Sequence, residues 1–102
     1  MDLRSDANDR LFHAVLNLET IEDCYRFFED LCTIKELRDL SQRFQIATLL
    51  DEGHNYQSIV RKVDASTTTI SRVNQCLTYG AGGYRDALNK MKPNKEATSS
   101  CP

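Results

Sequence analysis

The sequence has little that would place the protein in a membrane or outside the cell. None of its apolar runs approaches the roughly 18 residues that a membrane-spanning helix needs. Its first residues, MDLRSDANDR, include no apolar segment of the kind that a secretory signal carries. These absences predict a cytoplasmic protein with no membrane partner. The length of 102 residues predicts one small domain.

The paired cysteines of a structural metal site are also absent. A structural zinc site typically uses paired ligands at short spacing. We therefore expect no metal and no cofactor, and we expect reduced thiols packed mostly in helical cores. The four cysteines, none of which forms a C-x-x-C pair, are Cys24, Cys32, Cys76 and Cys101.

Catalytic groupings are sparse as well. His13 lies beside an apolar stripe and His54 follows Gly53, and neither has the neighbours of a catalytic triad or of a ligand site. The carboxylates are scattered over what should be helix surfaces. The sequence therefore predicts that the protein is not an enzyme.

Positive charge is concentrated in the second half of the chain. The net charge of −2 argues by itself against a nucleic-acid partner. Residues 1–52, however, hold six Lys/Arg and twelve Asp/Glu, whereas residues 53–95 hold seven basic and two acidic residues. Such asymmetry is a hint of a nucleic-acid or acidic partner, although a solvated charged face would give the same pattern.

Helical patterns cover most of the chain and strand signals are almost absent, so the predicted fold class is all-α. The stretches T-I-E-D at Thr20 and T-I-K-E at Thr33 are typical of helix starts, and Gly53 is typical of a helix end. Shorter helices are expected at residues 56–63, 67–79 and 84–91.

One domain is predicted for residues 1–92, followed by a disordered tail at residues 93–102. Within the domain, residues 7–53 form N-terminal dimerisation helices, residues 55–79 a helix-turn-helix, and residues 84–91 a C-terminal helix. The N-terminal helices carry more apolar surface than about 90 residues bury alone, which predicts an obligate homodimer. The expected interface residues are Leu11, Phe12, Leu16, Phe27 and Phe28.

Residues 56–75, YQSIVRKVDASTTTISRVNQ, have the pattern of a helix-turn-helix. Ile59 and Val63 are spaced to meet Ile70 and Val73 across a short turn that contains a small residue. This pattern predicts that the second helix enters the major groove of DNA. A generic helical hairpin could share the spacing.

Three consecutive threonines begin the second of these helices. Ser66 is its expected N-cap, so Thr67, Thr68 and Thr69 occupy the first turn, where a recognition helix meets bases and phosphates. We expect the hydroxyls of Thr68 and Thr69 to face outward. The alternative is that the threonines only begin the helix, for which one Ser or Thr would be enough. The polar face continues through Ser71, Arg72, Asn74 and Gln75.

The stretch LSQRFQIATLLDEGHNYQSIVRKVDASTTTISRVNQCLTYG, with CYRFFEDLCT upstream, resembles the Trp repressor superfamily, in particular its YerC/YecD-type branch. The similarity covers about residues 9–91. It implies an all-α, interlocked homodimer whose N-terminal helices wrap around the partner. It also implies a helix-turn-helix transcriptional regulator that binds double-stranded DNA.

The resemblance further implies a site for a small molecule. The Trp repressor binds tryptophan between two arginines, which match Arg43 and Arg72. Val73 stands where the repressor has a glycine that leaves room for the indole, and Cys76 replaces a serine that would face the amino group of the ligand. We therefore expect no dependence on tryptophan, and the sequence names no other effector.

The same comparison bears on DNA contacts. Gln57 and Val60 stand where the Trp repressor has basic residues that contact phosphate, which implies weaker or differently aimed binding. The threonine positions match recognition-helix positions that face DNA. The expected DNA-binding residues are Arg43, Gln57, Ser66, Thr67, Thr68, Thr69, Ser71, Arg72 and Gln75.

Two functions fit these observations. The first is a homodimeric, sequence-specific DNA-binding transcriptional regulator that acts through the helix-turn-helix. The second is an α-helical dimeric interaction module, whose acidic N-terminal half binds a protein partner and whose helix-turn-helix binds DNA weakly or is vestigial.

Overall fold

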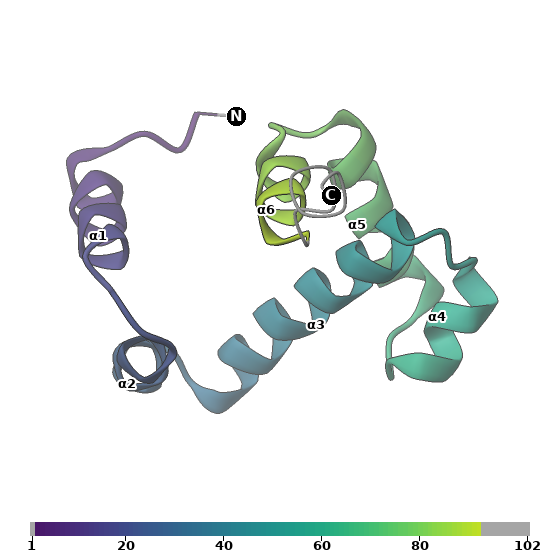
Figure 1. The fold of residues 1–102 in the computed structure, drawn as a ribbon, viewed down its shortest axis with the longest axis horizontal. Coiled ribbons are helices and arrows are strands. Elements are labelled where there is room, and N and C mark those ends of the chain that lie inside the picture. Colours follow the sequence, from purple (N-terminus) through teal and green to yellow (C-terminus); the bar gives the residue numbers. More distant parts are fainter. Residues whose placement is uncertain (1, 93–102) are drawn as a thin grey trace, which may run out of the picture. The chain divides into compact units, whose positions relative to one another are not determined.

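The computed structural model describes residues 2–92 and shows six helices, with no strand among these residues (Figure 1). The all-α fold class is confirmed, and the predicted tail at residues 93–102 lies outside the described part. Every helix within that part is too short or too polar to span a bilayer. The helices are α1 (Asp6–Leu16), α2 (Ile21–Leu31), α3 (Ile34–Asp51), α4 (Tyr56–Lys62), α5 (Thr67–Tyr79) and α6 (Gly83–Met91).

The chain forms two compact units, one ending at Arg38 and the other beginning at Asp39. In the first unit, no described residue is buried. The helices there are nevertheless capped, since the Thr20 hydroxyl accepts the Asp23 amide hydrogen at 3.0 Å, as the sequence predicts. Much of the apolar surface stays open to solvent, including Phe12 (57% exposed), Leu16 (77%), Ile21 (76%) and Tyr25 (57%).

The cysteines are less buried than expected. Cys24 and Cys76 are exposed and Cys32 is half-buried, while Cys101 lies outside the described residues. The prediction that the thiols pack in cores is therefore wrong for the single chain. Cys24 lies on α2, which has no buried residue. Helical periodicity correctly indicated an apolar face there, but nothing in residues 2–92 packs against that face closely enough to bury it.

Helix α3 has well-defined ends on both sides. Thr33 and Glu36 form the predicted capping box, with each side chain accepting the other residue's amide hydrogen at 3.0 and 2.8 Å. At the far end, Gly53 adopts a left-handed backbone (φ 95°) and the His54 amide donates to the Leu49 carbonyl at 3.1 Å. This is the glycine-terminated helix end that the sequence predicts.

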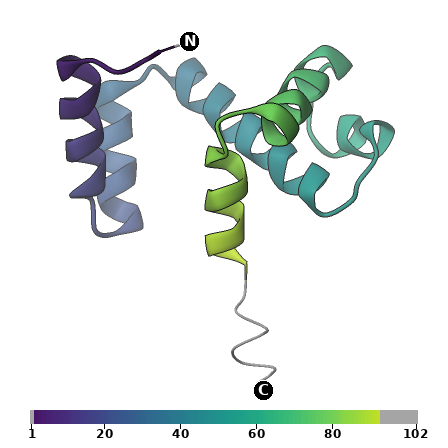
Figure 2. The ribbon, with the colours of Figure 1, turned by 90° about the horizontal axis from the view of Figure 1, so that it is seen from above.

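The core lies in the second unit, where α4 and α5 gather at the C-terminal half of α3 (Figures 1 and 2). Four helices contribute to it. The predicted meeting of the two apolar pairs of the helix-turn-helix is confirmed, because all four side chains belong to this cluster. Its buried members are Ile46, Ala47, Ile59, Val63, Ile70, Val73 and Leu88.

Helix α6 is held to the end of α3 by charge as well as by Leu88. The Asp51 carboxylate pairs with Arg85 and lies 3.1 Å from the Lys92 ammonium. Its side chain is only 9% exposed. The hydrogen bond from Lys92, with that from Arg85, lowers the pKa of Asp51 below its usual value against the opposing effect of burial.

Candidate nucleic-acid interface

The turn between α4 and α5 is fixed by hydrogen bonds on both of its sides. Within the turn, the Ala65 amide donates to the Val63 carbonyl at 2.8 Å. From α3, the Gln42 side-chain amide donates to the Asp64 carbonyl, also at 2.8 Å. Because α3 contributes directly to the core, this bond ties the angle between the two helices to the rigid part of the unit.

Helix α4 begins with a cap of its own. The Asn55 side-chain oxygen accepts the Ser58 amide hydrogen at 2.8 Å, as expected for an N-cap asparagine. The Ser58 hydroxyl lies 3.3 Å from His54 Nδ1, and His54 Nε2 lies 3.7 Å from a Glu52 carboxylate oxygen. These contacts stabilise the loop between α3 and α4.

The start of α5 uses its hydroxyls in two different ways. Ser66 is the N-cap, as predicted, since its hydroxyl accepts the Thr69 amide hydrogen at 3.2 Å. The Thr69 hydroxyl lies 3.1 Å from the same Ser66 oxygen, and Thr69 is half-buried. The expectation that the Thr68 and Thr69 hydroxyls both face outward is therefore wrong for Thr69, because its side chain completes the cap. Thr67 and Thr68 are exposed.

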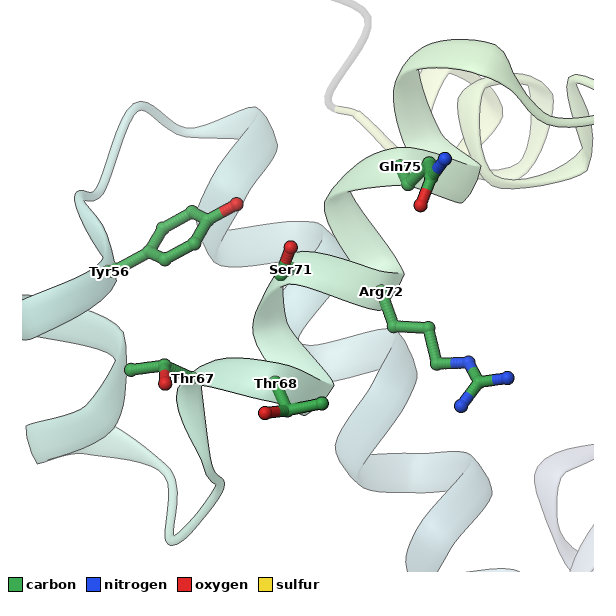
Figure 3. A pocket seen from close by; sticks show the side chains of 6 residues that line it. All are labelled: Tyr56, Thr67, Thr68, Ser71, Arg72 and Gln75. Carbon is green, nitrogen blue, oxygen red and sulfur yellow. The ribbon is translucent and has the colours of Figure 1, made fainter.

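An open hollow of about 570 Å³ lies on the exposed side of α4 and α5 (Figure 3). Tyr56 and Thr67 lie on one side of it, and Arg72 and Gln75 lie on the other. The structure thus brings together five of the predicted DNA-contacting positions and adds one from α4. The lining residues are Tyr56, Thr67, Thr68, Ser71, Arg72 and Gln75.

Other predicted contact residues lie outside this hollow. Gln57 on α4 and Arg43 on α3 are exposed but are not among the lining residues. Additional positive charge stands at the exposed last turn of α4, in Arg61 and Lys62. The charged groups nearest in sequence to the threonine turn are thus mostly basic, with Asp64 of the turn as the exception.

Two residues of this interface, Tyr56 and Gln42, were not predicted from the sequence. Tyr56 could have been predicted, because it follows the Asn55 cap and shares the first turn of α4 with Gln57, a predicted DNA contact. Gln42 could not, since its partner is 22 residues away in sequence.

Val73, which the resemblance places at the small-molecule site, is a core residue in the structure. Its exposed fraction is 4%. Phe44 packs near Tyr84, with ring centroids 6.4 Å apart, and burial raises the pKa of the Tyr84 hydroxyl. Among residues 2–92, no group of three or more His, Cys, Asp or Glu is arranged to hold a metal ion.

Comparison with known proteins places this arrangement in a family. Residues 7–92 match the family described as Trp repressor protein. The chain belongs to the Trp repressor family. Over 98 residues it is 47% identical to the uncharacterized protein YerC of Bacillus subtilis (strain 168), with 96% of this chain and 94% of YerC covered. The resemblance read from the sequence is thereby confirmed.

Two solved structures show the same fold. One is the crystal structure of a candidate Trp repressor from Staphylococcus aureus, with a TM-score of 0.84 and 47% identity, covering 87% of this chain and 89% of that one. The other is a TrpR-like protein from Eubacterium eligens ATCC 27750, with a TM-score of 0.84 and 46% identity, covering 87% and 92%. The Trp repressor fold is a regulatory, DNA-binding fold.

Proposed function

We propose that this Trp repressor family protein is a sequence-specific transcriptional regulator that acts as a homodimer and places α5 in the major groove of DNA. The observation that carries the proposal is the division of α5 into two faces. Ile70 and Val73 are buried in the core, whereas Thr68, Arg72 and Gln75 line an open hollow. A helix held by one face and polar on the other is suited to reading a groove.

The chemistry of the open face fits base edges and phosphates. Threonine hydroxyls donate and accept, and their methyl groups can contact the methyl of thymine. Arg72 is exposed and can pair with a phosphate or with two acceptors of guanine. The Gln75 amide offers both a donor and an acceptor, which matches adenine in the major groove.

Exposed apolar surface in the first unit supports the homodimer. No described residue before Asp39 is buried, although α1 and α2 carry Phe12, Leu16 and Ile21. A lone chain would hold this surface in water at a cost of about 25 cal/mol per Å². A second copy that covers it would also supply a second recognition helix, as two-fold symmetric operators require.

Independence of tryptophan is supported by the packing of Val73. This residue takes the position of the glycine that leaves room for an indole in the Trp repressor, and it is buried in the core. An added indole would overpack the site, which typically costs about 1–3 kcal/mol. DNA binding is therefore proposed to need no bound tryptophan.

The test is selection of duplexes from a randomised pool by the full-length protein, followed by titration of the enriched duplex and of a random duplex at several salt concentrations. We expect the enriched duplex to bind at least about 10³-fold more tightly, with a steep fall in affinity as salt rises. Failure to enrich any sequence, at low or high salt, would contradict the proposal. It would favour the interaction module in which the acidic half of the chain binds a protein.

A further inference from the structure

Tyr56 is the one residue of α4 among those that line the hollow, since the other five belong to α5. The hollow therefore bridges both helices of the helix-turn-helix. Figure 3 shows the Tyr56 ring beside Thr67, with its hydroxyl directed toward the side of Ser71. The Tyr56 ring therefore lines the hollow next to the hydroxyl-bearing residues Thr67 and Ser71.

The two ends of the Tyr56 side chain have different surroundings. The residue is half-buried and packs against the core cluster, which fixes the direction of the ring. No hydrogen bond from its hydroxyl to another group is seen within residues 2–92, and no buried side-chain polar atom there lacks a partner, so this hydroxyl is open to solvent. The hydroxyl is thus a donor that is held in position and left available to a ligand.

The five residues of α5 that line the hollow lie on two ridges of the helix. Thr67 and Ser71 are four residues apart and share the ridge next to Tyr56, whereas Thr68, Arg72 and Gln75 follow each other at spacings of four and three. The Tyr56 side of the hollow therefore offers neutral donors alone. The other ridge offers the bidentate groups that distinguish one base from another.

We propose that Tyr56 donates a hydrogen bond from its hydroxyl to a backbone phosphate of the bound DNA, and so positions the Thr68–Arg72–Gln75 ridge over the base edges. This rests on the proposed function. Phosphate oxygens accept hydrogen bonds readily and take half to two-thirds of protein–DNA hydrogen bonds, often from hydroxyl side chains. The first helix of a helix-turn-helix crosses the backbone, so a group on α4 reaches phosphate before it reaches a base.

The contact offsets a loss of charge on the same helix. Gln57 and Val60 of α4 are uncharged at the positions where the resemblance implies basic phosphate contacts. A neutral hydroxyl holds the backbone without releasing a counterion. Affinity contributed by Tyr56 should accordingly be independent of salt, unlike affinity contributed by Arg72.

The test compares the wild type with Tyr56→Phe, which keeps the ring and removes only the hydroxyl. Binding to the enriched duplex and to a random duplex is measured over a range of salt concentrations. We expect both affinities to fall by a similar factor of about ten, because a bond to a charged acceptor is lost, with an unchanged salt slope and an unchanged melting temperature. Arg72→Ala is the charged contrast: a guanidinium that enters the groove displaces counterions of the nearby phosphates, so its loss should lower the salt slope by about one.

The matched control is Tyr79→Phe, which makes the same change at an exposed tyrosine at the end of α5, outside the hollow. It should bind like the wild type, and an equal loss in this variant would overturn the assignment. Wild-type affinity in Tyr56→Phe would overturn it while leaving the proposed function intact. A loss confined to the enriched duplex would mean that Tyr56 reads a base, which also overturns it. A wild-type protein that binds no duplex would overturn the proposed function and this contact together.

Discussion

Gln42 on α3 and Asp64 in the turn between α4 and α5 are joined by a hydrogen bond of 2.8 Å, from the glutamine side-chain amide to the aspartate carbonyl. The two residues are 22 positions apart in sequence. The bond connects the helix that carries Ile46 and Ala47 of the core to the turn that sets the direction of α5.

Replacing Gln42 with alanine should therefore loosen the turn without removing core side chains. We expect the free energy of unfolding to fall by about 0.5–1.5 kcal/mol, because one intramolecular hydrogen bond is lost and the exposed Asp64 can turn to water. DNA affinity should fall as well, because the orientation of α5 relative to α3 would be less well fixed. Urea unfolding and DNA titration measure the two effects. Gln45→Ala, at an exposed position of the same helix, is the control and should change neither quantity.

The pairing of Asp51 with Arg85 and Lys92 predicts a dependence of stability on pH. The pKa of Asp51 is lowered in the folded protein, so its stabilisation is complete above the ordinary carboxyl value of 3.8 and is lost as pH falls through the lower, folded value. Asp51→Asn should be less stable than the wild type at neutral pH. Its disadvantage should shrink in acid, because the wild type loses the same contribution there.

Thermal unfolding at a series of pH values measures this difference. Asp86→Asn, which removes an exposed carboxylate from α6, is the control. A stability gap between Asp51→Asn and the wild type that stays constant from neutral pH into acid would mean that the two ion pairs do not hold α6 in place.

The open apolar face of the first unit predicts concentration-dependent stability. A dimer that buries Leu16 should melt at a higher temperature as protein concentration rises, because dissociation and unfolding are coupled. Leu16→Glu should dissociate the dimer, since it places a charge in an apolar interface. Leu3→Glu, an equal change at an exposed residue before α1, should not. Sedimentation that shows a folded wild-type monomer at micromolar concentration would refute the dimer.

Tryptophan should neither bind tightly nor change DNA affinity. Val73 stands where the Trp repressor has a glycine, and it is buried at 4% exposure among core residues, so we expect its side chain to exclude an indole. Calorimetric titration with L-tryptophan should show no heat from a micromolar site, and the affinity for the enriched duplex should be equal with and without it. A micromolar site would mean that Val73 moves aside to admit the ligand.

Local features of the helix-turn-helix could be predicted from the sequence because their causes are local. The cap at Ser66, the cap at Asn55 and the extent of α5 follow from side chains within four residues and from the spacing of apolar positions. The same holds for the buried pair Ile70 and Val73.

Contacts between distant segments could not be predicted in this way. The bond between Gln42 and Asp64 depends on how α3 meets the turn, and the place of Tyr56 in the hollow depends on how α4 meets α5. The orientation of Thr69 was missed because any threonine in a first turn can point outward or back to the cap. Helical periodicity alone did not distinguish a core face from a face that the single chain leaves open, as at Cys24.

The central claim is that the start of α5 reads DNA, and Thr68→Ala tests it most directly. Thr68 is exposed and lines the hollow, whereas the neighbouring Thr69 hydroxyl is engaged by Ser66, so Thr69→Ala serves as the matched control. Thr68→Ala should keep nearly the stability of the wild type, because alanine is the better helix former. Thr69→Ala should lose about 1 kcal/mol of stability, because its hydroxyl contact with Ser66 is removed. The measurement is the ratio of affinities for the enriched duplex and for a random duplex. We predict that Thr68→Ala loses about 1–3 kcal/mol of binding to the enriched duplex alone, while Thr69→Ala loses little. If Thr68→Ala binds both duplexes like the wild type, the threonine turn only begins a helix and the claim is contradicted.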